Sequence, residues 1–177
     1  MKKRIFDCIT FYKANMLFEM RFHILQKYVD FFVVCEASKS HTGEQKGYNF
    51  NLNFLNKYKD RIIYLKLDGL PKIEIKEKKH YGLLKIQMEH LFKGIKSANP
   101  DDLIIFSDED EIPNPNSIEN FKCNERKFGL FLQNMYYYKL NILGLDEGNG
   151  NWAGSRICKK KYLKSFFKFK LLKKKNI

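Results

Sequence analysis

Apolar residues along this chain gather in short runs that alternate with longer stretches of helical spacing. Four of these runs are rich in apolar, β-branched and aromatic residues, as in the buried strands of a parallel sheet. They span residues 4–11, 30–36, 61–67 and 103–107. Apolar residues at helical spacing between them predict helices over 19–28, 52–59 and 81–95. This alternation predicts an α/β domain with a largely parallel sheet flanked by helices.

The end of the chain departs from this alternation. Two further strand-like runs, 128–138 and 153–157, flank a glycine-rich loop at 148–151. Residues 159–177 then mix lysines with phenylalanine and leucine. Such a segment either lies in an anionic membrane interface or packs its aromatic residues on the domain. We therefore expect one domain over residues 1–158 and a basic aromatic tail over 159–177.

The overall charge of the chain changes little in these predictions. Lys and Arg total 33 against 20 Asp and Glu, a formal net charge of +13, and residues 159–177 hold much of the surplus. No nucleic-acid-binding motif accompanies this charge, so we expect no nucleic-acid partner. A basic surface remains compatible with phosphate-bearing ligands or anionic lipid.

The sequence shows no sign of export or of a zinc site. No stretch approaches the roughly 20 apolar residues of a membrane span, and Asp7 interrupts any signal-peptide core. The cysteines, Cys8, Cys35, Cys123 and Cys158, form no C-x-x-C pair and have no histidine at ligand spacing. We expect a cytoplasmic protein with reduced thiols, in contact with the inner membrane face only through its tail.

An acidic run, Asp108-Glu109-Asp110-Glu111, directly follows the fourth predicted strand. Ligands of open α/β sheets collect at the carboxyl ends of strands, so this position suits a binding site. Residues two apart in an extended segment share a side, which places Asp108 and Asp110 together and Glu109 away from them. Two such carboxylates repel by roughly 1–4 kcal/mol, and Mn²⁺ or Mg²⁺ would relieve that repulsion.

The same run has a second interpretation. Asn114 and Pro115 are typical of an N-cap and of a first helical residue. Acidic residues just before a helix interact favourably with its dipole. On this interpretation the four carboxylates form a solvated turn that leads into a helix, and no metal is involved.

Three longer stretches resemble segments of a known family, and they follow one another in the same order and spacing. They are FDCITFYKANMLFEMRFHIL, VDFFVVCEASKSHTG and PDDLIIFSDEDEIPNP, with weaker similarity at MYYYKLN and NWAGSRI. Over about its first 158 residues the chain resembles glycosyltransferase family 17, which contains the β-1,4-mannosyl-glycoprotein β-1,4-N-acetylglucosaminyltransferases. The resemblance implies a GT-A-like, that is Rossmann-like, fold, a UDP-sugar donor, inversion at the anomeric carbon, and a glycan or lipid-linked glycan as acceptor.

The resemblance also implies roles for single residues. Asp108 and Asp110 would hold Mn²⁺ or Mg²⁺ against the donor diphosphate, and Asp108 would also contact the nucleotide sugar. Glu36, Thr42 and Gly43 would line the nucleotide pocket, with Gly43 allowing close approach of the backbone. The alternatives are an exposed carboxylate at a strand end for Glu36 and an ordinary turn at Thr42-Gly43.

Gln87 is a further donor-binding candidate, because it lies in the helix before the metal strand. Family members carry a Gln-Arg pair there, whereas Met88 follows Gln87 in this chain and the nearest basic residue is Lys85. Nothing after Ile157 resembles the Gly-Trp-His-containing segment that helps to build the acceptor side in the family.

An inverting transfer needs a general base for the acceptor hydroxyl. We nominate Glu111, with Asp146 and Glu147 as reserves, although Glu111 has a rival role at the start of the following helix. Trp152 would either stack on a sugar ring or belong to the core. The leading hypothesis is thus a metal-dependent inverting glycosyltransferase, with N-acetylglucosamine as the candidate sugar. The alternative is a truncated, catalytically silent module that binds a nucleotide sugar or a partner.

Overall fold

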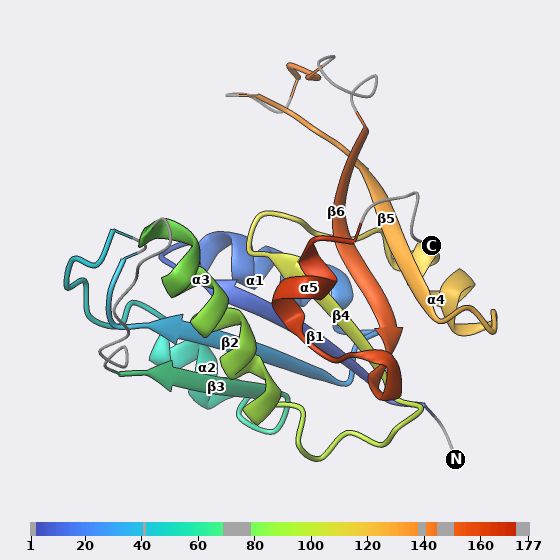
Figure 1. The fold of residues 1–177 in the computed structure, drawn as a ribbon, viewed down its shortest axis with the longest axis horizontal. Coiled ribbons are helices and arrows are strands. Elements are labelled where there is room, and N and C mark those ends of the chain that lie inside the picture. Colours follow the sequence, from blue (N-terminus) through green and yellow to red (C-terminus); the bar gives the residue numbers. More distant parts are fainter. Residues whose placement is uncertain (1–2, 41, 69–78, 138–140, 145–150, 173–177) are drawn as a thin grey trace.

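The computed structural model describes residues 3–40, 42–68, 79–137, 141–144 and 151–172. Its centre is a six-stranded sheet of order β3-β2-β1-β4-β6-β5 (Figure 1). The first four strands in the chain pair in parallel, whereas β6 is antiparallel to both β4 and β5. The strands are β1 (Ile5–Phe11), β2 (Phe31–Ala37), β3 (Ile62–Leu67), β4 (Leu103–Asp108), β5 (Phe128–Asn134) and β6 (Asn151–Lys159).

Helices cover both faces of the sheet (Figure 1). One face carries α1 (Asn15–Leu25), α2 (Leu52–Lys57) and α4 (Pro115–Lys122). The other carries α3 (Lys79–His90) and the short α5 (Phe166–Lys170). Single 3-10 turns follow α3 at Leu91–Lys93 and β6 at Lys160–Tyr162. The predicted α/β architecture, a Rossmann-like and mostly parallel sheet flanked by helices, is confirmed.

The continuous apolar runs follow from this layering. Successive side chains of a strand point to opposite faces. In β1, Ile5 and Ile9 therefore pack beneath α1, whereas Phe6 and Cys8 pack beneath α3. Because both faces are covered, nearly every residue of the central strands is apolar. The two exceptions that matter for function are Asp7 in β1 and Ser107 in β4, both buried.

The described part of the tail, residues 159–172, packs on the domain. Phe166 and Phe169 are buried, and the Phe166 ring lies 4.9 Å from that of Phe92 and 5.6 Å from that of Phe106, centre to centre. These two side chains are therefore occupied in the core and cannot insert into lipid. Membrane contact through the remaining tail residues stays a prediction. In the described part of the chain, every helix is too short or too polar to cross a bilayer.

The strand order reverses between β1 and β4. From β1 the chain adds β2 and β3 on one side, and β4 then returns to the other side of β1. In open α/β sheets such a reversal leaves a crevice at the carboxyl ends of the two strands, where ligands bind. Here those ends are Phe11 and Asp108.

Candidate functional site

A cavity of about 300 Å³ opens at the carboxyl ends of β1 and β4. Its lining combines strand ends, helices on both faces of the sheet, and the acidic turn. The lining residues are Thr10, Phe11, Tyr12, Leu17, Leu84, Gln87, Asp108, Glu109, Asp110 and Lys170. Three of the residues predicted for donor or metal binding, Gln87, Asp108 and Asp110, thus meet at one place.

The acidic run forms a turn. Asp108 is the last residue of β4, and the Glu111 N–H donates to the Asp108 carbonyl at 3.2 Å. Because the chain bends here, Asp108, Glu109 and Asp110 all line the cavity. The expectation that Glu109 points away was therefore wrong, since it assumed an extended segment.

Glu109 joins the two strand ends. Its Oε2 accepts a hydrogen bond from the Tyr12 N–H at 2.9 Å, just after β1. Burial raises the pKa of the Glu109 carboxyl, hydrogen bonds from the Tyr12 and Ala14 backbones oppose this, and the charges of Asp110 and Asp108 raise it further. A partly buried carboxylate of raised basicity thus faces the cavity.

Glu111, the nominated base, lies behind the turn. Its side chain is only 9% exposed. Oε1 accepts from the Trp152 indole N–H at 2.6 Å, and Oε2 accepts from the Asp108 N–H at 3.0 Å. Both oxygens therefore hold protein groups in place. The indole of Trp152 is itself 46% exposed, so its ring is not a core residue. The reserve candidates Asp146 and Glu147 lie outside the described residues.

A buried polar network fixes the acidic turn from below. Arg21 of α1 makes two hydrogen bonds to the Asp7 carboxylate, at 2.6 and 2.7 Å. The same guanidinium donates to the Glu111 carbonyl at 2.7 Å and to the Ser107 hydroxyl at 2.8 Å. Ser155 of β6 hydrogen-bonds to the Ser107 hydroxyl at 2.7 Å and to the Glu111 carbonyl at 3.0 Å.

Sequence reasoning missed this network. Asp7 and Arg21 are 1% and 0% exposed; Asp7 interrupts the apolar run of β1, and Arg21 shares the buried face of α1 with Phe18, Phe22 and Leu25. A charged residue in the middle of a run that must be buried is the one signal that would have found them, because a buried charge requires a partner.

Glu36, predicted to line the nucleotide pocket, is completely buried. Its carboxylate accepts from Lys46 Nζ at 2.7 Å, Tyr64 OH at 2.6 Å and the Asn49 and Phe50 backbones at 2.8 and 3.1 Å. Burial acts to raise the pKa of Glu36, but the hydrogen bonds from Lys46, Tyr64 and Asn49 outweigh it and lower the pKa. Glu36 therefore organises the loop after β2, and it is not the exposed strand-end carboxylate of the alternative interpretation.

Thr42 and Gly43 lie in that loop and are absent from the cavity lining. Thr42 shares a 2.6 Å hydrogen bond with the Ser40 hydroxyl. Gly43 has φ +92°, a conformation that favours glycine, but open space surrounds its Cα. The glycine is thus explained by the turn. Lys46 of the same loop does not line the cavity either, although its Nζ lies 5.3 Å from the centre of the ring of Tyr12, which does.

Gln87 of α3 is buried and closes the floor of the cavity. Its amide NH₂ donates to the Cys35 carbonyl at 2.7 Å and to the Phe11 carbonyl at 3.2 Å. These carbonyls stand near the ends of β2 and β1, which Gln87 therefore ties together. Its donors are directed to the backbone.

The residues present fit a divalent cation in part. Among the described residues, no three His, Cys, Asp or Glu side chains are grouped to hold a metal ion. Asp108 and Asp110 supply two carboxylates, so phosphate oxygens and waters would complete the shell, a common arrangement for Mg²⁺. Oxygen donors suit both Mg²⁺ and Mn²⁺. One oxygen of Asp108, Oδ2, forms an ion pair with Lys170 Nζ.

The predicted start of a helix at Asn114 and Pro115 is confirmed next to the site. Asn114 caps α4 by accepting from the Asn116 N–H at 2.9 Å, and Pro115 is its first residue. The cap and the acidic turn are separate features, because Asp108, Glu109 and Asp110 line the cavity and Glu111 is held behind them.

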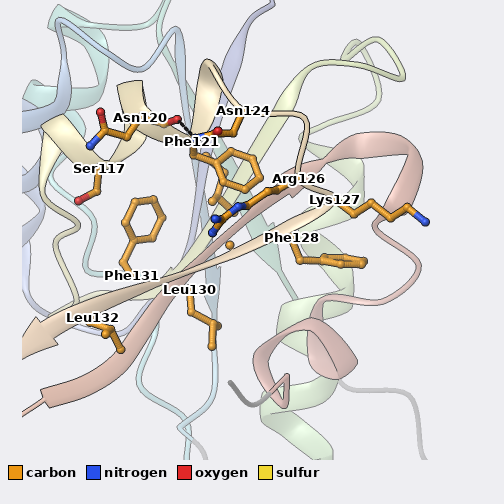
Figure 2. Close-up of a pocket in the computed structure, with 12 residues that line it drawn as sticks. Ser117, Asn120, Phe121, Asn124, Arg126, Lys127, Phe128, Leu130, Phe131 and Leu132 are labelled. Atoms are coloured by element: carbon orange, nitrogen blue, oxygen red, sulfur yellow. Dashed lines mark hydrogen bonds between the residues drawn. The ribbon is translucent and has the colours of Figure 1, made fainter. Parts of the chain in front are cut away.

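A larger open groove of about 1,050 Å³ lies between α4 and β5. Figure 2 shows Phe121 and Phe131 on its walls and Lys127 pointing away from it. None of the predicted site residues lines this groove.

A family model described as glycosyltransferase family 17 matches residues 1–156. This match includes every residue of the acidic turn and of the network beneath it. No curated protein sequence matches the chain.

Proposed function

The chain belongs to glycosyltransferase family 17, and from this premise we propose that it transfers a sugar from a UDP-sugar, such as UDP-N-acetylglucosamine, to a hydroxyl of a glycan or lipid-linked glycan. The observation that carries the proposal is the cavity at the ends of β1 and β4. Three adjacent carboxylates line it at the point where the strand order reverses, which is the ligand position of open α/β sheets.

In this proposal the acidic turn binds the donor diphosphate through Mn²⁺ or Mg²⁺. Asp108 and Asp110 would hold the ion, which would stabilise the negative charge of the departing nucleoside diphosphate. The buried pair of Arg21 and Asp7 keeps the turn in position, because Arg21 also binds the Glu111 carbonyl. Catalysis needs such preorganisation, since the carboxylates must not reorganise as charge develops.

Two carboxylates, Glu111 and Glu109, are candidates for the general base. Glu111 remains a prediction, and to act as a base it must release Trp152 or the Asp108 N–H. Glu109 faces the cavity, and burial raises its pKa. A base of raised pKa accepts a proton more readily near neutral pH. The geometry therefore favours Glu109, with Glu111 positioning the turn.

Trp152 is the proposed contact for the acceptor. Its indole N–H is fixed by Glu111, and nearly half of its surface is open to solvent. An exposed aromatic ring held at one edge offers its face to a sugar ring.

Calorimetric titration of UDP and UDP-sugars, with and without Mn²⁺, tests the proposal. We expect Mn²⁺ to strengthen binding of UDP, and Asp110→Ala to abolish that gain, a loss of roughly tenfold or more in affinity. Asp101→Ala is the matched control, because Asp101 is an exposed aspartate beside the opposite end of β4. If no nucleoside diphosphate binds under either condition, the proposed function is wrong.

Release of free UDP in the presence of glycan acceptors distinguishes the enzyme from the catalytically silent module. Binding with turnover supports transfer. Binding without turnover, across a panel of glycan and lipid-linked acceptors, supports the silent module instead.

A further inference from the structure

The acidic turn already has a cation in contact with it. Lys170 Nζ forms an ion pair with Asp108 Oδ2, and the two side chains are 26% and 34% exposed. Both residues line the cavity assigned above to the donor. Lys170 is the last residue of α5, 62 positions after Asp108 in the chain.

The position of Lys170 is set by folded structure. Phe166 and Phe169 of α5 are buried in the core between the sheet and α3. At the start of α5, Glu89 of α3 accepts hydrogen bonds from the Ser165 hydroxyl and from the Phe167 N–H. The backbone of Lys170 is therefore held, while its flexible side chain reaches the cavity.

A second cation stands on the same side of the sheet. Arg156 of β6 pairs across from Phe106 of β4, so its side chain shares the face of Phe106 and Asp108. Burial lowers the pKa of Arg156, and the charges of Glu111 and Asp108 act against this. Its Nε is the one buried side-chain nitrogen or oxygen in the described part of the chain that lacks a hydrogen-bond partner.

The balance of charges around the cavity indicates which class of ligand it binds. Among the described residues, three carboxylates line the cavity with a single ammonium. A diphosphate adds about two negative charges, and like charges held this close repel one another. An ammonium on a flexible stem can move between a carboxylate and a phosphate oxygen a few ångströms away, since lysine presents a compact charge with rotatable donors.

We propose that Lys170 is a donor-binding residue whose ammonium transfers from Asp108 to an oxygen of the nucleoside diphosphate when the donor enters the cavity. This inference rests on the proposed function and adds to it a metal-independent contact to the diphosphate. The same movement frees Asp108 Oδ2 for the divalent cation. Lys170 thus holds the turn before the donor binds and the phosphate afterwards.

Affinity for UDP in the presence of EDTA tests this inference, because no metal then contributes. We expect Lys170→Gln to weaken metal-free binding of UDP by roughly tenfold, the usual size of one lost charge-assisted hydrogen bond. Uridine, which has no phosphate, should bind both proteins equally. Lys170→Arg should keep the affinity for UDP within a few-fold of the wild type.

Lys168→Gln is the matched control, since Lys168 lies on the same helix but is exposed and does not line the cavity. It should leave the affinity for UDP unchanged. Thermal unfolding of each variant checks that α5 still packs.

The outcomes separate the two proposals. If wild type binds UDP in EDTA and Lys170→Gln binds it equally well or more tightly, Lys170 only competes with ligands for Asp108, and this inference is overturned while the proposed function stands. An equal loss of uridine and UDP affinity would mean a change of cavity shape and would also overturn it. If wild type binds no nucleoside diphosphate even with Mn²⁺, both proposals fall.

Discussion

Carboxylates near the site differ in what their oxygens contact. Glu36 and Asp7 are buried and fully engaged by donors from the protein, as is Glu111. Asp110 is exposed, and Glu109 faces the cavity with a raised pKa. The oxygens of such carboxylates are occupied by protein donors and are not open to a ligand. The residues that act on a ligand are therefore expected among those facing the cavity.

Glu109→Gln should lower the turnover rate by roughly 10²- to 10⁴-fold, the usual range for loss of a general base. The rate of the wild type should rise with pH around a value above 4.5, because burial raises the pKa of Glu109 above that ordinary value. Glu111→Gln should keep this pH profile and lower the free energy of unfolding instead. A Glu109→Gln variant with full activity would return the base role to Glu111.

The pKa of Glu109 also has a consequence for stability. Because the folded state binds this proton more tightly than the unfolded state, the free energy of unfolding should fall as pH rises from 4.5 through the folded pKa. A glutamine side chain does not titrate, so Glu109→Gln should remove this decrease. Chemical denaturation at several pH values measures it, and identical pH dependence of the two proteins would contradict the assigned environment.

At the scale of elements, Arg21 joins four segments. It lies on α1, pairs with Asp7 of β1, and contacts Ser107 of β4 and the Glu111 carbonyl after it. Ser155 of β6 meets the same two groups on β4 and the turn. The position of the acidic turn is thus determined by packing between elements that are distant in sequence.

Arg21→Met should destabilise the protein by about 3–5 kcal/mol, because it leaves the buried Asp7 carboxylate without its partner. Lys122→Met is the control, since Lys122 forms an exposed pair with Glu119 and should cost about 1 kcal/mol or less. Replacing Asp7 by Asn together with Arg21→Met should recover part of the loss. Urea denaturation measures all three, and equal effects of Arg21→Met and Lys122→Met would contradict the structural role.

The predictable part of this fold was its local periodicity. Residues 4–11 and 103–107 were recognisable as strands because both faces are buried, and Asn114-Pro115 marked the start of α4. The start of α1 at Asn15, rather than at residue 19, was not predictable, because Ala14 makes no side-chain cap and tertiary packing of Phe18 decides it.

The site was predictable only where chemistry shows in local sequence. The acidic run was found because four adjacent carboxylates are unusual in a chain of net charge +13. The contact of Lys170 with Asp108 could not be predicted from the sequence. Lys170 is one lysine among many, and only the fold, which places α5 beside β4, distinguishes it. Sequence alone also could not distinguish Glu36, which holds a loop, from a ligand-binding carboxylate.

At the scale of the whole molecule, a chain of net positive charge carries a small acidic cavity. The formal net charge of +13 attracts anions at long range and should speed the approach of a diphosphate at low salt. The three carboxylates that line the cavity act in the opposite direction at short range, because they repel an anion unless a cation accompanies it. We expect the attraction by the net charge and the repulsion by the carboxylates to favour anions that bind together with a metal ion or contact Lys170.

The reactivity of the cysteine thiols shows whether the core of the protein is intact. Cys8, Cys35 and Cys158 are buried, whereas Cys123 is exposed. Burial raises the pKa of Cys35 to about 12 and also raises the pKa values of Cys8 and Cys158. A thiol-labelling reagent should therefore modify one cysteine rapidly in the native protein and all four after denaturation. Cys123→Ser should abolish the rapid phase, and rapid labelling of a second thiol would show that the core opens.

The cavity takes Thr10 from the first strand of the sheet and Lys170 from α5. During translation, Thr10 emerges from the ribosome long before Lys170. The second edge of β1 stays unpaired until β4 has emerged. A nascent chain that has emerged only through β4 holds the parallel half of the sheet but no finished pocket. Emergence of α5, or its later removal by a protease, therefore decides whether Lys170 stands in the wall of the cavity.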